Sequence, residues 1–400
     1  MQLTFWEKLR YLLLLLLVAL ITISSHPTIV ETSRNAGLES GTILSRYIIL
    51  VFLSLFLICL NVNSMMKVKV VRKVLGSLVF IALAYLLTFS LFGERSMVSD
   101  IRAILICLMA IMIGCQLNID DRKYRFLLFA FSLLMLFVGL MQVFVNIGGF
   151  VILDQYHADN KNRLGVMLVT AGVILFYMGL NYSKNKLVKA ILYVLAILIF
   201  IVLLTVRART ATLTAFIMAL YILYERYKGK DFFAYFIIGL IVIALFYLFS
   251  PQSVKDYVYN SFFQNYEERD VTSGRTERNR AALTFLSKHI FIGNLNQNVS
   301  IGWVHNYLLN KLFEYGLVFS LPFVSLYLYL LIYVIKKTLR SKKNDIRSIG
   351  YYLLLVPFII SMAEPTLPFG PGNATVFNFL VFGMAIGPSE RANTPSVVGS

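Results

Sequence analysis

The residues best suited to chemistry gather late in the chain, in the one long polar interruption of an otherwise apolar sequence. This interruption runs from about Pro251 to Trp303 and leads directly into His305 and Asn306. A histidine at the junction between a polar loop and an apolar segment can transfer a proton between a polar substrate and a membrane-embedded one. A helix-start histidine that bonds to water is the alternative, and position alone leaves both open.

Arginines are the second group of candidates. Arg275 and Arg278 come directly after Ser273 and a glycine, a pattern that predicts a helix start with Ser273 as its cap. Three residues apart, the two arginines would share a helical face. Arg207 and Arg209 stand between two apolar runs. Guanidinium groups beside a helix start suit the oxygens of a diphosphate, although a solvated helix and snorkelling side chains explain the same residues.

Several other chemistries are excluded by spacing. The sequence has no H-x-x-H, H-E-x-x-H, C-x-x-C or D-x-D pattern, so it predicts neither a metal site nor a cofactor. Cys59, Cys107 and Cys115 lie in apolar runs and are predicted to be buried packing residues. The net charge of +17 resides mainly in short loops between apolar segments, which argues against nucleic acid as a partner.

The elements that must position these residues are apolar helices. The 400 residues are 58% hydrophobic and 14% charged, with a mean hydropathy of +0.75, far from the composition of a soluble domain. Continuous apolar runs predict an all-α polytopic membrane protein, a single membrane domain over residues 1–400 with about twelve spans. The predicted centres are Leu17, Phe56, Leu83, Met109, Met135, Ile174, Ala196, Met218, Gly239, Tyr327, Leu355 and Leu380.

The charge pattern predicts the topology of these spans. Basic residues fall on every second connection, around 67–73, 122–125, 184–189, 226–230 and 336–343. The positive-inside rule makes these connections, and both termini, cytoplasmic. The other connections then face outward, including 207–210, the large extracytoplasmic loop 251–303 and 364–373.

The order of motifs over about residues 200–320 resembles the O-antigen ligase and Wzy-type polysaccharide polymerase family. The matching strings are Arg209-Thr210-Ala211, Ser273-Gly274-Arg275, Phe291-Ile292-Gly293, His305-Asn306 and Glu314-Tyr315-Gly316. The His-Asn-x-x-Leu string with the later Glu-x-Gly is the most specific part. The sequence departs from the family where Asn279 or Arg280 replaces a Trp, where Lys288-His289-Ile290 replaces His-Pro, and where Asn294 replaces a glycine, so Arg275 and Arg278 both remain candidates for the aligned arginine.

The resemblance implies a GT-C-like membrane enzyme of a bacterial cytoplasmic membrane, a metal-independent inverting glycosyltransferase with an outward-facing active site. Its donor would be an oligosaccharide on undecaprenyl diphosphate and its acceptor a sugar hydroxyl. By this resemblance Arg209 and Arg275 would hold the diphosphate, and His305 would orient or deprotonate the acceptor. The residues expected to bind substrate beside them are Arg207, Arg278, Asn306 and Glu314.

Polymerisation of repeat units is the expected activity, because the chain shows no further domain for docking another acceptor. A ligase that transfers finished glycan remains an alternative within the family. A transporter or flippase of lipid-linked oligosaccharide and a scaffolding membrane protein are alternatives from other classes; few midspan charges argue against the transporter. The family also predicts a chain-length regulator and a flippase as pathway partners.

Overall fold

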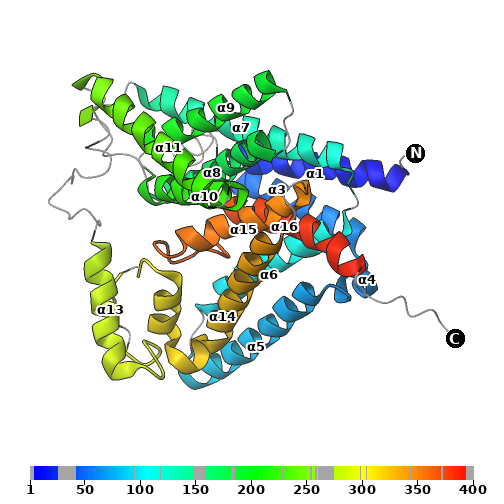
Figure 1. Cartoon of the computed structure of the whole chain (residues 1–400). Helices are drawn as coiled ribbons and strands as arrows, with labels where there is room; N and C mark the ends of the chain where they lie inside the picture. The colour runs from blue at the N-terminus through cyan, green and yellow to red at the C-terminus, as the bar shows by residue number, and fades with distance from the viewer. Residues whose placement is uncertain are drawn as a thin grey trace.

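The described part of the chain is helical and contains no strand (Figure 1). The computed structural model describes residues 4–25, 42–93, 96–117, 119–147, 158–181, 185–206, 208–227, 229–252, 255–256, 259, 274–297, 299–302, 304–341, 345–370 and 373–392. Its helices are α1 (Phe5–Ile23), α3 (Thr42–Cys59), α4 (Val62–Met66), α5 (Lys69–Phe92), α6 (Met97–Gln116), α7 (Asp121–Ile147), α8 (Ala158–Asn181), α9 (Lys186–Thr205), α10 (Arg209–Tyr227), α11 (Lys230–Phe249), α13 (Arg275–His289), α14 (Tyr307–Arg340), the 3₁₀ turn η2 (Ile346–Ser348), α15 (Ile349–Ile360) and α16 (Asn373–Ala392).

Length and hydropathy make six of these helices long and apolar enough to cross a membrane, among the described residues. They are α5, α6, α7, α8, α9 and α14. Each of the twelve predicted centres lies inside a helix, but some of these helices are short. The 12 residues of α15 give about 18 Å of rise, against about 30 Å of hydrocarbon. The fold fits an all-α membrane protein.

The core forms where α6, α8, α15 and α16 pack together. In α8, 83% of an 18-residue apolar stretch is buried within the structure, so this helix lies inside the bundle. α6 and α16 make the most extensive helix contact, and they approach closely because Gly114 and Gly383 face each other without side chains. The buried Asn378 is satisfied, since its Nδ2 donates to Leu353 O (2.7 Å) and Thr170 Oγ1 (3.0 Å).

α14 is interrupted at Gly316, where φ is 66° and ψ is 177°. This conformation is essentially restricted to glycine. The break receives the turn after α13, whose Gly293 also has a positive φ of 64°, and an added Cβ on either glycine would collide with the backbone of the other segment. Three backbone hydrogen bonds join the segments: Leu317 N to Ile290 O (2.7 Å), Val318 N to Phe291 O (3.2 Å) and Asn294 N to Phe313 O (2.9 Å).

Replacing Gly316 with alanine is therefore expected to destabilise the protein. The backbone strain alone costs about 1–3 kcal/mol, and the collision with the 291–293 turn adds to it. Thermal unfolding of purified protein in detergent should show a lower Tm for Gly316→Ala. Gly76→Ala is the matched control, because Gly76 lies within α5 with open space around its Cβ position and alanine favours a helix. Equal Tm values for the two variants would contradict the interlocked turn.

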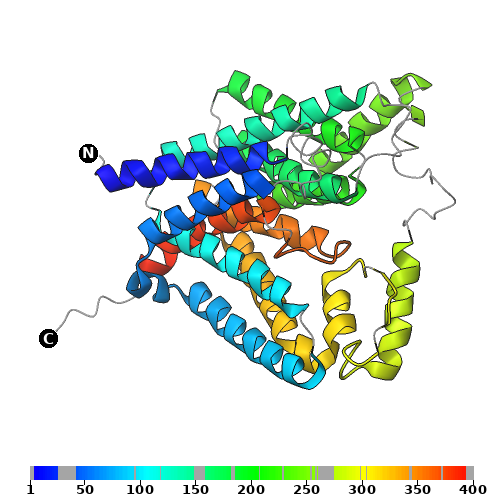
Figure 2. The same ribbon diagram turned by 180° about the vertical axis from the view of Figure 1, so that it is seen from behind.

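The bundle has two distinct ends. α1 begins and α16 ends at the right of Figure 1, whereas α13 lies at the left edge; the opposite view in Figure 2 shows the same separation. α13 occupies the second half of the predicted loop 251–303, so part of that loop is a helix packed on α14. The residues of the loop outside the described ranges include 260–273 and Trp303.

Candidate active site

α13 presents its arginines from a helix that is anchored on α14. Ala282 and Leu286 are buried on its inner face, and Ala282 clusters with Val304 and Phe313. The ring of Phe285 meets Phe313 edge to face, with centroids 5.2 Å apart. This contact fixes the helix whose first two turns carry the predicted arginines.

The expected helix start after Ser273 is confirmed, but its expected cap is not. α13 begins at Arg275, and the capping position is Gly274, which has a φ of 73° and provides no side-chain hydrogen bond. Ser273 lies outside the described residues. Glycine fits this position because a left-handed backbone lets the chain turn sharply into the helix.

Arg275 joins three segments that are far apart in the sequence. Its Nη2 donates to Glu364 Oε1 at 2.9 Å, and its Nη1 donates to Thr210 Oγ1 at 3.1 Å. Glu364 lies in the connection between α15 and α16 and is 7% exposed, and Thr210 is the second residue of α10. The planar guanidinium makes the two contacts from two different nitrogens, whereas a lysine would have to reach both acceptors from a single nitrogen. Arg275 is therefore fixed at the place where α10, α13 and the α15–α16 connection meet.

Arg278 contacts His305. Its Nη1 lies 3.2 Å from Nε2 of the imidazole. Because arginine has donors and no acceptor, Nε2 must carry the lone pair, and a neutral His305 then carries its proton on Nδ1. Nδ1 is buried and has no hydrogen-bond partner among the described residues. A buried donor of this kind is available to a ligand oxygen.

The surroundings of His305 hold the ring in its neutral form. Its pKa falls to about 4, first because burial penalises the charged imidazolium and then because Arg275 and Arg278 repel it. A neutral imidazole is the form that can accept a proton.

The titration of His305 can be followed by NMR of protein labelled at its four histidines. We expect one signal, lost in His305→Gln, to titrate with a pKa of about 4 rather than the ordinary 6.5. Because the folded pKa is depressed, the associated stability is present above about pH 6.5 and is lost as the pH falls toward 4. Arg278→Met should move the pKa upward, whereas an ordinary pKa in the wild-type protein would contradict the geometry.

The other four predicted site residues differ from one another in position and in hydrogen-bond partners. Asn306 caps α14, accepting from Leu309 N (3.0 Å), and its Nδ2 donates to Met362 O (3.2 Å). Arg209 is the first residue of α10, next to Thr210. Glu314 pairs with Lys311 (2.8 Å) rather than with a predicted arginine. Arg207 lies outside the described residues.

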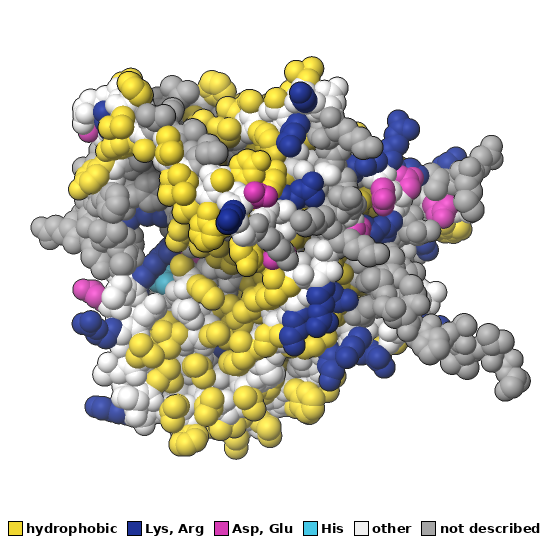
Figure 3. Space-filling view, in the orientation of Figure 1, with side chains coloured by type: hydrophobic (Ala, Val, Ile, Leu, Met, Phe, Trp, Pro, Cys, Tyr) yellow, Lys and Arg dark blue, Asp and Glu magenta, His cyan; other side chains and the backbone are white. Residues whose placement is uncertain are grey.

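The surface beside α13 is hollowed. Figure 3, in the orientation of Figure 1, shows an opening at the left with Lys or Arg side chains and a histidine at its edge. Among the described residues, no group of three or more His, Cys, Asp or Glu side chains is arranged to hold a metal ion. The chemistry that this arrangement offers is the binding of an anion by guanidinium groups beside a neutral imidazole.

Two residues of the site, the partners of Arg275, were not predicted from the sequence. Glu364 stood only as the edge of a predicted outward connection, and no spacing links it to Arg275, which is 89 residues away. Thr210 stands out in the sequence only as the residue that follows Arg209 in one of the matching strings. A lone acidic residue directly after an apolar run was the only available signal.

No protein-family model matches the chain, and no curated protein matches it significantly. The family resemblance therefore rests on the order of the motifs in the sequence alone.

Proposed function

We propose that the chain is a bacterial membrane glycosyltransferase that polymerises undecaprenyl-diphosphate-linked repeat units into a surface polysaccharide. The observation that carries the proposal is the convergence of Arg275, Arg278 and His305: Arg278 contacts the imidazole, and both guanidinium groups lie close enough to repel its charged form. A basic hollow with a neutral histidine suits a diphosphate leaving group and a hydroxyl nucleophile.

The proposed topology has about twelve spans, both termini in the cytoplasm and the hollow at the outer face. Two arrangements support it. α13 lies at the end of the bundle opposite the start of α1 and the end of α16, and Figure 3 shows many Lys and Arg side chains on the right, away from the hollow. Basic residues at the inner face are what the positive-inside rule requires.

The donor would bind through its diphosphate. Arg275 and Arg278 offer N–H groups from one helix, and Arg209 stands at the start of α10 beside Thr210. When the bond between the sugar and the diphosphate breaks, the leaving group gains negative charge. Guanidinium groups that already contact the phosphate oxygens when the bond breaks would stabilise that charge without further reorganisation, and this is worth more in a partly desolvated site.

The acceptor hydroxyl would be activated by His305. The oxygen of that hydroxyl attacks the anomeric carbon of the donor sugar, and the bond from that carbon to the diphosphate oxygen breaks. The proton of the hydroxyl passes to Nε2 of His305. Arg278 occupies Nε2 before substrate binds, so transfer of Arg278 to a phosphate oxygen would release the lone pair. Donor binding would thereby prepare the base, with attack opposite the leaving group giving inversion.

The other expected residues have supporting roles in this proposal. Asn306 sets the start of α14 directly after His305. Glu314 keeps one carboxylate oxygen on Lys311 and is partly exposed, and it would bind a sugar hydroxyl. Arg207 would add to the cationic edge near Arg209. A chain-length regulator and a flippase of the same pathway are the proposed partners.

The proposal is tested by gel analysis of glycan length in a strain that lacks this gene. Without the protein, single repeat units should accumulate on the carrier lipid at the outer face, and the wild-type gene should restore long glycan. Repeat units trapped at the inner face would indicate a flippase instead, and long glycan left on the carrier lipid would indicate a ligase.

A further inference from the structure

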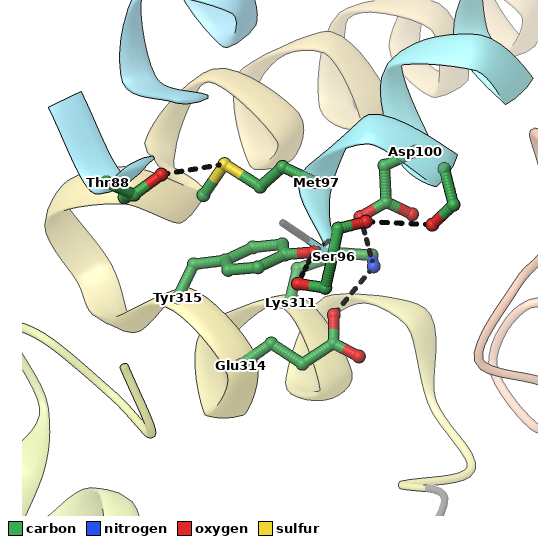
Figure 4. A network of polar contacts seen from close by, with 8 residues as sticks. Thr88, Ser96, Met97, Asp100, Lys311, Glu314 and Tyr315 are labelled. Atoms are coloured by element: carbon green, nitrogen blue, oxygen red, sulfur yellow. Dashed lines mark hydrogen bonds and ion pairs between the residues drawn. The ribbon is translucent and has the colours of Figure 1, made fainter. Parts of the chain in front are cut away.

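A second charged cluster joins α14 to the start of α6 (Figure 4). Lys311 Nζ donates to Asp100 Oδ2 (2.7 Å) and to Glu314 Oε2 (2.8 Å). Asp100 Oδ2 also accepts from the hydroxyl of Tyr315 (2.8 Å), which lies 3.1 Å from Ser96 Oγ. The mechanism proposed above gives a role to Glu314 alone and none to Lys311, Asp100 or Tyr315.

Lys311 is unusually buried for a lysine, and its ammonium is surrounded by aromatic rings. It is 4% exposed, and its Nζ lies 5.2–6.0 Å from the centroids of three rings. These rings belong to Tyr307, Tyr315 and Phe323. A buried ammonium within an apolar helix is costly unless it is paired, so such a residue commonly has a role beyond packing.

The segment that carries Lys311 is short and bounded. It runs from the cap Asn306 to the break at Gly316. On one side, Tyr307 N donates to Ser361 O (3.0 Å), which attaches its start to the connection that also holds Glu364. Lys311 attaches the same segment to α6. His305 directly precedes the cap, so the position of its ring depends on both attachments.

We propose that Lys311, paired with Asp100, is a positioning residue for the transfer reaction. It fixes the segment 307–315 so that His305 meets Arg278. The inference rests on the proposed function only for its kinetic consequence. Displacement of a catalytic group by about 1 Å can cost about 100-fold in rate, whereas substrate binding through the arginines of α13 would be unaffected.

The test compares variants of the full-length protein in liposomes. Lys311→Met/Asp100→Asn removes both members of the pair without changing the net charge, and the partly exposed Glu314 stays hydrated. Lys311→Arg keeps the charge and is the rescue variant. Lys337→Met is the matched control, because Lys337 lies near the end of the same helix and also contacts a tyrosine ring (5.4 Å).

Two readouts decide the role of Lys311. For the double variant we expect kcat to fall about 100-fold with KM for the lipid-linked donor unchanged, and the His305 pKa to rise from about 4 toward 6.5. Lys311→Arg should recover part of both values. A double variant with the kcat and the His305 titration of Lys337→Met would overturn the inference.

The experiment also decides the case in which the double variant does not fold and the case in which the wild-type protein is inactive. If the double variant does not fold, Asp100→Asn alone carries the comparison, since Lys311 then keeps Glu314; a lower kcat at unchanged KM supports the inference, and a wild-type kcat overturns it. If the wild-type protein forms no glycosidic bond, the proposed function fails. The NMR comparison of His305 then still decides whether Lys311 positions the ring.

Discussion

Replacing His305 with alanine is expected to stop the formation of long glycan, while single repeat units accumulate on the carrier lipid. The variant keeps the arginines of α13 and therefore the proposed diphosphate site, but it loses the group proposed to take the acceptor proton. General base catalysis contributes about 10²–10⁴-fold in rate, so a loss of this size leaves little polymer in a growing cell. Gel analysis of extracted glycan in the deletion strain measures the effect.

His289→Phe is the matched control for this experiment. His289 ends α13, away from the Arg278 contact, and its ring stacks on Phe285 with centroids 4.7 Å apart. Phenylalanine keeps that stacking and removes the imidazole chemistry, so glycan length should be normal. The His305→Ala protein must reach the membrane at the wild-type level for the comparison to hold. Full-length glycan from His305→Ala at that level would show that another group accepts the proton.

Replacing Arg275 with methionine is expected to reduce the rate of transfer by about 10²–10³-fold, the range found when one donor to a developing oxyanion is removed. Arg275→Lys should restore little of it, because a lysine has only one nitrogen with which to reach Thr210, Glu364 and a diphosphate. Arg280→Met serves as the control, since Arg280 is exposed on the same helix. Initial rates with a lipid-linked donor give the measurement.

Arg275→Met also destabilises the protein, and the two effects must be separated. The variant breaks the ion pair between Arg275 and the buried Glu364 carboxylate, which costs on the order of 3 kcal/mol. Arg275→Met/Glu364→Gln removes that charge as well and should recover the Tm. We expect the double variant to remain inactive. A double variant that is both stable and active would assign Arg275 a structural role only.

The helices were predictable because apolar runs leave few alternatives in a membrane. The centres from Leu17 to Leu380 all fall in helices, since a spanning segment must satisfy its own backbone. The break in α14 was not predictable from its own sequence, in which Pro322 is the obvious interruption. It occurs at Gly316 because the turn around Gly293, from another element, inserts there.

The site was predictable in its residue types and not in its pairings. Arg275 and Arg278 were expected on one helical face, and α13 places both near His305. Their partners, Glu364 and His305, depend on how α13 packs against distant segments, which no local pattern encodes. The same holds for the pairing of Glu314 with Lys311. Buried pairs of this kind are decided by tertiary contacts alone.

One hollow is proposed to bind a lipid diphosphate and to catalyse the transfer of its glycan. The most direct test uses purified protein in liposomes with a polyprenyl-diphosphate-linked repeat unit, and follows product mass together with released polyprenyl diphosphate. We predict growth by whole repeat units with one diphosphate released for each new linkage, and neither product from Arg275→Met/Glu364→Gln. A wild-type protein that leaves the donor intact, or a double variant that extends it normally, would contradict the account.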